Sequence, residues 1–140
     1  MPNITGHCLC NAVRFTISAA LGPAAYCHCT DCRRVTGSAF NISVPVAAAG
    51  FEIAAGQPKA YTMTADSGTE LTRHFCGDCG APVYTSSPKH PDTVYVKAGL
   101  LDDPSLVEPG HQSWVHSAVP WSEIDARLPS YDKASGQYED

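Results

Sequence analysis

Seven cysteines are the residues of this 140-residue sequence with the clearest capacity for chemistry. They form three groups along the chain: Cys8 with Cys10, then Cys27 with Cys29 and Cys32, then Cys76 with Cys79. An odd number of cysteines cannot make a complete disulfide framework, and close C-x-C and C-x-x-C spacing is typical of thiolate metal sites. The pattern therefore favours metal ligation over disulfide bonds.

The spacing inside each group explains how it could chelate an ion. In extended backbone, alternate side chains point the same way, so a C-x-C pair can present both sulfurs to one metal. The C-x-x-C pair lies between two strand-like segments, where Gly77 and Gly80 allow the tight turn that ligation needs. The first and last pairs would together make a closed site of four thiolates. The middle group would keep three ligands, which is the number at catalytic zinc sites.

A second assignment uses the same cysteines differently. It joins Cys29 and Cys32 to Cys76 and Cys79 as two C-x-x-C knuckles, and it leaves Cys8, Cys10 and Cys27 over. Spacing alone leaves both assignments open. A set of three ligands from one contiguous loop can form by local geometry, and this favours the first assignment.

A zinc ion with three thiolates would take its fourth ligand from solvent or from a substrate. Three thiolates give the unit a net negative charge, so it lowers the pKa of bound water less than a zinc held by neutral histidines. A substrate thiol would still be deprotonated by coordination and would remain a good nucleophile. Its attack on a small aldehyde would produce an alkoxide, which a nearby donor must then protonate.

Short alternating segments predict a mainly β protein. Val13, Phe15 and Ile17 alternate with polar residues, the period expected of a half-buried strand. Similar segments, each bounded by glycine, proline, aspartate or serine, cover residues 40–44, 59–63, 71–75, 81–85 and 93–99.

One short helix is expected inside the middle cysteine group. Thr30 could cap it, Asp31 falls in its first turn and Gly37 could end it. A second short helix could follow Pro104, although Pro109 and Gly110 would stop it soon after. The alanine-rich segment 47–55 is predicted to be loop and edge strand.

Several side chains near this helix are candidates for the pocket. A helix N-terminus directed at the cysteines would help to keep the thiolates anionic. His28 lies between two ligands and should point away from the metal, as a surface or packed residue. Arg33 and Arg34 could attract an anionic substrate or could form a solvated helix face. Residues 36–38 could line the pocket, although capping alone explains their types.

Histidines and tryptophans in the second half of the chain are weaker candidates. Alternation places His74 on the opposite face from Arg73, as a group near the metal ligands or, as we favour, an exposed strand residue. His111 and His116 are ambiguous in the same way. Trp114 and Trp121 are expected in the core or in a pocket wall.

Length and charge limit the classes of function. A chain of 140 residues, 44% hydrophobic, suits one domain over residues 1–140. No signal peptide and no run of 18 apolar residues is evident, so we expect a cytoplasmic protein without a membrane partner. The net charge of −5 and the lack of a basic run argue against a nucleic-acid partner.

The cysteine motifs also resemble a known family. GHCLCNAVRF, YCHCTDCRRVTGSAF, GQPKAYT, RHFCGDCGAPVY and PWSEIDARLP, in this order, are similar to the glutathione-dependent formaldehyde-activating enzymes, a family that includes the centromere-protein-V type domain. The match runs nearly end to end, and it includes Arg73 two residues before the aromatic of F-C-x-x-C-G.

The resemblance implies a β-tent fold and two zinc ions per chain. It implies a structural zinc at Cys8, Cys10, Cys76 and Cys79 and a catalytic zinc at Cys27, Cys29 and Cys32. The implied activity is that of a carbon-sulfur lyase that joins formaldehyde to glutathione as S-hydroxymethylglutathione. Two other readings stay open, namely the same zinc site acting on another small carbonyl or thiol, and a zinc-binding interaction module without turnover.

Overall fold

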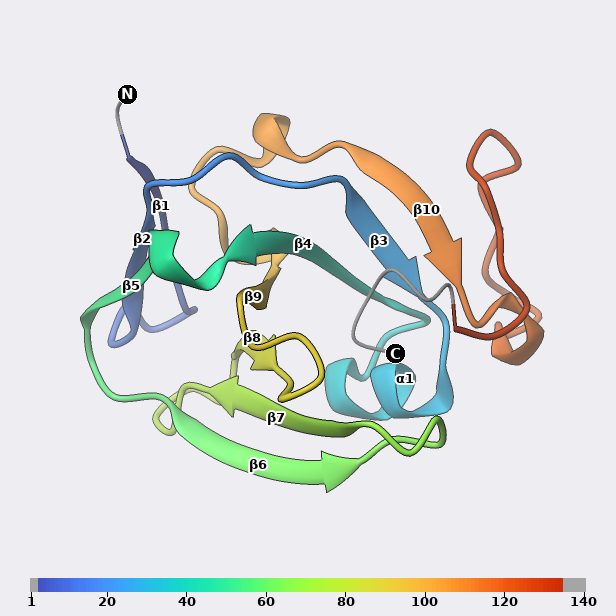
Figure 1. Ribbon diagram of the computed structural model, residues 1–140, viewed down its shortest axis with the longest axis horizontal. Coiled ribbons are helices and arrows are strands. Elements are labelled where there is room, and N and C mark those ends of the chain that lie inside the picture. Colours follow the sequence, from blue (N-terminus) through green and yellow to red (C-terminus); the bar gives the residue numbers. More distant parts are fainter. Residues whose placement is uncertain (1–2, 135–140) are drawn as a thin grey trace.

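The computed structural model describes residues 3–134, and strands dominate this part of the chain (Figure 1). The strands are β1 (Ile4–His7), β2 (Arg14–Ile17), β3 (Ala24–Cys27), β4 (Asn41–Ala47), β5 (Phe51–Ala55), β6 (Lys59–Thr64), β7 (Glu70–Phe75), β8 (Pro82–Ser86), β9 (Thr93–Lys97) and β10 (Pro109–Ser113). The helical elements are α1 (Thr30–Thr36) and four single 3-10 turns, Ala48–Gly50, Ala98–Leu100, Pro104–Leu106 and Val115–Ser117. The prediction of a mainly β fold with short helices is confirmed.

The strands form two sheets. A three-stranded sheet has the order β1-β2-β5, and a seven-stranded sheet has the order β10-β3-β4-β9-β8-β7-β6. All pairs are antiparallel except β10 and β3, which run parallel. In Figure 1 the larger sheet follows an arc from β10 to β6, and α1 lies within the opening of this arc.

The core lies where the two sheets meet. Val13, Phe15 and Ile17 are at most 2% exposed, as the alternation predicts, whereas Arg14 is exposed. The ring of Phe51 in the smaller sheet lies 5.5 Å from Phe15 and 4.8 Å from Tyr84 in the larger one. Burial of these side chains is the main force holding the sheets together.

Helix α1 ends as predicted but begins differently. Gly37 adopts a left-handed conformation (φ 66°) and donates its backbone N–H to the carbonyl of Arg33, which closes the helix. The N-cap is Cys29 and not Thr30, because the Cys29 sulfur accepts a hydrogen bond from the backbone N–H of Cys32. Thr30 is instead the first helical residue and is exposed.

Other local predictions agree with the structure. The segment 47–55 forms a 3-10 turn and then β5, an edge strand of the smaller sheet. The second helix is only the 3-10 turn Pro104–Leu106. After β10 the chain folds back along that strand, and the backbone N–H groups of residues 114–116 donate to carbonyls of residues 131–133.

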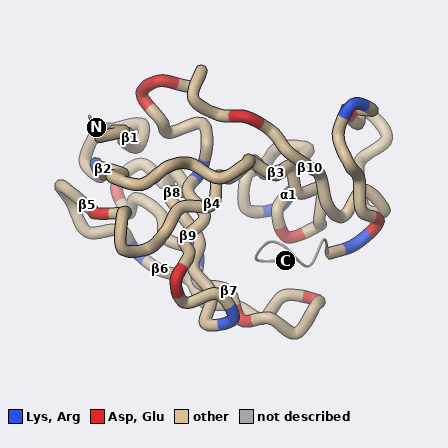
Figure 2. The backbone as a smooth tube through the Cα atoms, turned by 45° about the horizontal axis from the view of Figure 1, so that its top comes forward, with Lys and Arg blue, Asp and Glu red and all other residues tan. Residues whose placement is uncertain are grey.

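Charged residues are dispersed over the fold. Figure 2 shows basic residues interspersed with acidic ones along the tube, in keeping with the net charge of −5. Among residues 3–134, no helix has both the length and the apolar character needed to cross a membrane.

Candidate metal centres and pocket

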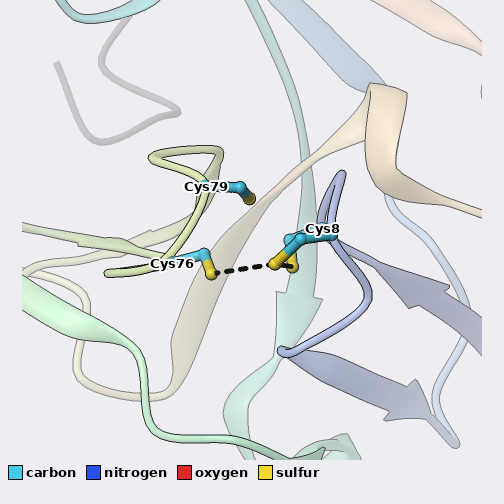
Figure 3. A group of neighbouring side chains, drawn as sticks. Cys8, Cys76 and Cys79 are labelled. Atoms are coloured by element: carbon cyan, nitrogen blue, oxygen red, sulfur yellow. Dashed lines mark hydrogen bonds between the residues drawn. The ribbon is translucent and has the colours of Figure 1, made fainter.

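The first and last cysteine pairs meet at one place in the fold. The sulfurs of Cys8, Cys10, Cys76 and Cys79 all lie within 4.8 Å of one another. Figure 3 shows Cys8, Cys76 and Cys79 directing their sulfurs toward a common point, from the turn after β1 and from the turn between β7 and β8. This cluster therefore connects the smaller sheet to the larger one.

The backbone conformation of both turns brings the cysteine sulfurs close together. Gly80 has a left-handed backbone (φ 79°) and donates its N–H to the carbonyl of Cys76, which closes the C-x-x-C turn. The C-x-C pair is not extended as the sequence suggested. Its backbone turns instead, since the N–H of Asn11 donates to the carbonyl of Cys8.

The four sulfurs fit a tetrahedral metal site. The Sγ atoms of Cys8 and Cys10 are 3.7 Å apart, and those of Cys10 and Cys76 are 3.8 Å apart. Zn–S bonds of about 2.3 Å imply sulfur-sulfur edges of about 3.8 Å in a tetrahedron. The backbone N–H of Ala81 is the largest of the causes that lower the pKa of Cys79, to about 6, so this sulfur is readily anionic.

The middle group forms a second cluster around the start of α1. The sulfurs of Cys27, Cys29 and Cys32 also lie within 4.8 Å of one another. Cys27 ends β3, Cys29 caps the helix and Cys32 lies in its first turn. Cys27 and Cys32 are buried, and Cys29 is partly exposed.

Electrostatics in this cluster suit a cation. Hydrogen bonds from Cys27 and Cys32 lower the pKa of Cys29 to about 3. The neighbouring Cys29 and Cys32, together with burial, raise the pKa of Cys27 far above its usual range, because a second thiolate beside the first is unfavourable. A divalent metal would relieve this conflict, and an all-sulfur set suits zinc. The residues present therefore fit the implied metal.

The grouping of sulfurs differs from the knuckle assignment. That assignment needs Cys29 and Cys32 beside Cys76 and Cys79, whereas among residues 3–134 each C-x-x-C pair belongs to a different cluster.

A small pocket opens beside the three-cysteine cluster. Its volume is about 30 Å³. The lining residues are Cys27, Cys29, Thr30, Asp31, Cys32, Ala65, Asp66, Leu71, Arg73, Trp114 and Ser117. A site of this size admits a group not much larger than one or two water molecules.

Five lining residues were not singled out as pocket residues from the sequence, namely Ala65, Asp66, Leu71, Arg73 and Ser117. Arg73 is only 8% exposed, and its charge contributes to lowering the pKa values of Cys29 and Asp31. Leu71 precedes it on the same face of β7, and Asp66 lies in the turn before that strand. The only sequence signal for this wall is the place of Arg73 in the cysteine motif. Trp114 lines the pocket, as expected of a wall residue.

Asp31 is a pocket residue with a raised pKa. Burial is the main cause that raises its pKa, and the nearby Cys29 and Asp66 raise it further. Its carboxyl group therefore holds a proton more readily than an exposed aspartate.

Other candidates lie elsewhere. Arg33, Arg34 and residues 36–38 are outside the pocket lining, and Arg34 is exposed. The Thr36 hydroxyl donates to the carbonyl of Cys32, which is a helix contact. His28 is packed as expected, at 2% exposure, and its Nε2 lies 3.4 Å from Oε1 of Gln112.

The remaining aromatic candidates divide between buried and exposed positions. The expectation that His74 is exposed is wrong, because its ring stacks on Tyr84 with centroids 4.0 Å apart and is partly buried. His111 is buried and packs edge-on against Tyr131, and His116 is exposed. Trp121 is 72% exposed, so the prediction that it lies in the core or a pocket wall is wrong. It falls in the irregular chain after β10, where alternation gives no guide to burial.

Comparisons with known proteins include a similar fold and two related sequences. The fold is similar to the crystal structure of a Rhodobacter sphaeroides protein, with a TM-score of 0.59 and 17% identity, covering 91% of this chain and 98% of that one. A Halomonas elongata protein named "Putative glutathione-dependent formaldehyde-activating enzyme" is 28% identical over 130 residues, 89% of this chain and 82% of its own. A Penicillium rubens protein with the same name is 27% identical over 118 residues, 81% of this chain. The match spans 60% of that longer protein.

The family-level comparison covers both cysteine clusters. The model of the glutathione-dependent formaldehyde-activating enzymes matches residues 3–117, which include all seven cysteines, Arg73 and Trp114. The chain belongs to the glutathione-dependent formaldehyde-activating enzyme family.

Proposed function

We propose that this chain is a zinc-dependent carbon-sulfur lyase that joins a small aldehyde to a thiol, with formaldehyde and glutathione as the substrates. The observation that carries the proposal is the cluster of Cys27, Cys29 and Cys32 opening onto a pocket beside the buried Arg73. The other four cysteines make a separate cluster between the sheets. We further propose one cytoplasmic domain over residues 1–140 with two zinc ions.

Each cluster has a distinct proposed role. Cys8, Cys10, Cys76 and Cys79 would hold a structural zinc, whose binding energy is also folding energy. A zinc held by Cys27, Cys29 and Cys32 would favour the deprotonated form of a substrate thiol. The pocket of about 30 Å³ is small, so the bulk of a thiol such as glutathione would stay outside it.

The reaction adds a thiol across a carbonyl group. The thiol gives up its proton, its sulfur forms a bond to the carbonyl carbon, and the C=O π pair moves to the oxygen. The resulting alkoxide takes up a proton to give the hemithioacetal, so atoms and charge balance. Asp31 or solvent would supply this proton, because Asp31 lines the pocket. Neither His28 nor His74 lines this pocket.

Cobalt substitution tests whether a thiol enters the site. We expect glutathione to change the thiolate-to-metal charge-transfer bands of the cobalt protein, with release of a proton and weaker binding as pH falls. Formaldehyde should then react faster than in the uncatalysed mixture. The matched control is Cys29→Ser, which should lose one of two metals, the spectral response and the rate acceleration.

The same titration separates the other readings. A response to cysteine or a small dithiol but not to glutathione would keep the site and change the thiol substrate. If no thiol changes the spectrum, thiol activation is wrong for this chain, and an interaction module or another carbonyl reaction takes its place.

A further inference from the structure

The larger sheet has one apolar face and one polar face, and both are buried. On the first face, valines of β4 and β9 pack with the smaller sheet, namely Val44, Val46, Val94 and Val96. The second face lies toward α1, which occupies the opening of the arc in Figure 1. It carries Asn41, Ser43, Arg73, Thr85 and Lys97, all at most 8% exposed. Buried polar groups need partners, so this face suits a polar ligand better than a second apolar layer.

The register of the strands fixes the direction of two cations on the polar face. Residues directly opposite on neighbouring strands share a face, and so do residues two apart on one strand. Such steps connect Arg73 to the cluster residue Cys27 through Thr85, Tyr95, Lys97, Ser43 and Asn41. The Nζ of Lys97 donates to Oδ1 of Asn41 over 2.6 Å, which keeps the ammonium group on this side of the sheet. Arg73, Lys97 and Cys27 therefore share one face.

A cavity of about 300 Å³ lies between this face and α1, and we call it the α1 cavity. Val35 of α1 is part of its lining, together with Arg73 and Lys97. A further cavity of about 220 Å³ is lined by Thr36 of α1 and shares Pro82 and Lys97 with the first. Arg73 also lines the small pocket beside the three-cysteine cluster. The side chain of Arg73 thus connects that pocket to a much larger space next to the helix.

The charges around the α1 cavity favour an anion. Arg73 and Lys97 are its basic lining residues, and no aspartate or glutamate is among the described residues that line it. Asp31 and Asp66 belong to the lining of the smaller pocket instead. Positive charges in a partly buried site attract an anionic group more strongly than they would in water. Tyr61 also lines the cavity and is 62% exposed, so part of the rim lies at the surface.

We propose that the α1 cavity binds a carboxylate of the substrate thiol while the sulfur of that thiol lies at the three-cysteine cluster. The inference rests on the proposed function, since it takes a thiol as a substrate, and it makes thiols with a carboxylate the substrate class. The small pocket leaves the bulk of such a thiol outside, and the adjoining cavity has room for it. Arg73 and Lys97 are then the residues that determine specificity for the thiol.

Esterification of a ligand tests whether the protein selects a carboxylate. S-methylglutathione keeps both carboxylates but has no thiol to deprotonate, so its binding does not depend on thiol activation. We expect calorimetric titration of the zinc-loaded full chain to show that S-methylglutathione binds and that added salt weakens this binding. Its diethyl ester, in which both carboxylates are masked, should bind about tenfold more weakly, because a charge-assisted contact is lost.

Lys97→Met tests whether the carboxylate lies in the α1 cavity. The substitution keeps an unbranched apolar side chain and removes the ammonium group, so S-methylglutathione should bind about tenfold more weakly. Binding of the diethyl ester should change little, because the ester has no carboxylate for Lys97 to attract. A merely structural role of Lys97 would weaken both ligands equally. Lys89→Met, in the exposed loop after β8, makes the same change in net charge and should leave both affinities unchanged.

The outcomes separate this inference from the proposed function. If the ester binds as tightly as the acid, or if Lys97→Met binds the acid normally, the carboxylate does not lie in this cavity and the inference is wrong. The proposed function then stands as long as glutathione changes the cobalt spectrum. If glutathione leaves that spectrum unchanged while S-methylglutathione binding depends on its carboxylates and on Lys97, thiol activation fails and the anion site is retained. Should Lys97→Met not fold, the comparison of acid and ester in the unaltered protein decides.

Discussion

Arg73 shows how one buried cation can define a site at the residue scale. It is 8% exposed, its Nε donates to the sulfur of Met63, and its guanidinium acts on both Cys29 and Asp31. A positive charge held in this way favours anionic groups in the pocket. The two arginines that follow Cys32 lie outside the lining, so Arg73 is the basic side chain that lines the pocket.

Replacing Arg73 should weaken binding of an anionic thiol. We expect Arg73→Met to raise the dissociation constant for glutathione by about tenfold, because a charge-assisted contact contributes about 1.5–3 kcal/mol before local screening. Calorimetric titration of the zinc-loaded protein measures this. Arg34→Met on the exposed face of α1 is the matched control and should leave binding unchanged. Equal effects of both changes would show that only overall charge matters.

At the scale of elements, α1 carries the metal-binding geometry of the middle cluster. Cys32 lies in its first turn, and Cys29 is both its N-cap and a member of the cluster. A sulfur that accepts the N–H of Cys32 is held in place before any metal binds. The other end of the helix depends on Gly37, whose left-handed backbone ends it.

Gly37→Ala should destabilise α1 through its backbone alone. A Cβ at this position meets no atom within 4 Å, so the cost comes from the left-handed conformation and should be about 1 kcal/mol in the free energy of unfolding. Urea unfolding followed by circular dichroism measures it. Gly99→Ala is the control, since a Cβ there also meets open space without a positive φ, and it should change stability by less than about 0.5 kcal/mol. Similar losses for both would place the effect outside the helix cap.

At the scale of the whole molecule, the four-cysteine cluster joins segments that are far apart in the sequence. Cys10 and Cys76 are 66 residues apart in sequence, and their sulfurs lie 3.8 Å apart between the two sheets. The rings of Phe15, Phe51 and Tyr84 make the other connection. A metal in the cluster would therefore link the sheets directly, whereas the three-cysteine cluster lies beside β3 and α1.

The two clusters should differ in their effect on stability. We expect Cys79→Ser to lower the free energy of unfolding by more than about 4 kcal/mol, because it removes a ligand from a site whose metal binding is coupled to folding. Cys29→Ser should cost less than half as much. Thermal unfolding of zinc-loaded variants, with metal content measured in parallel, gives the order. The reverse order would contradict the proposed structural and catalytic roles.

The sequence by itself determined the local features of this protein. Alternation located β2 and its buried face, Gly37 ended the only α-helix among the described residues, and the cysteine motifs identified the family. These features depend on neighbouring residues, so a short stretch of chain contains the information. The start of the helix is an exception, because the sequence predicts Thr30 as the cap and the Cys29 sulfur takes that position in the structure.

Tertiary structure alone decided which cysteines meet and what surrounds them. Spacing allowed two groupings, and the order of strands in the sheets brought the turn after β1 to the turn between β7 and β8. Arg73 and Trp114 reach one pocket because β7 and β10 lie on different sides of the segment that carries Cys27 to Cys32, although 40 residues separate the two in sequence. Such contacts result from burying one shared core, a property of the whole chain that no local pattern records.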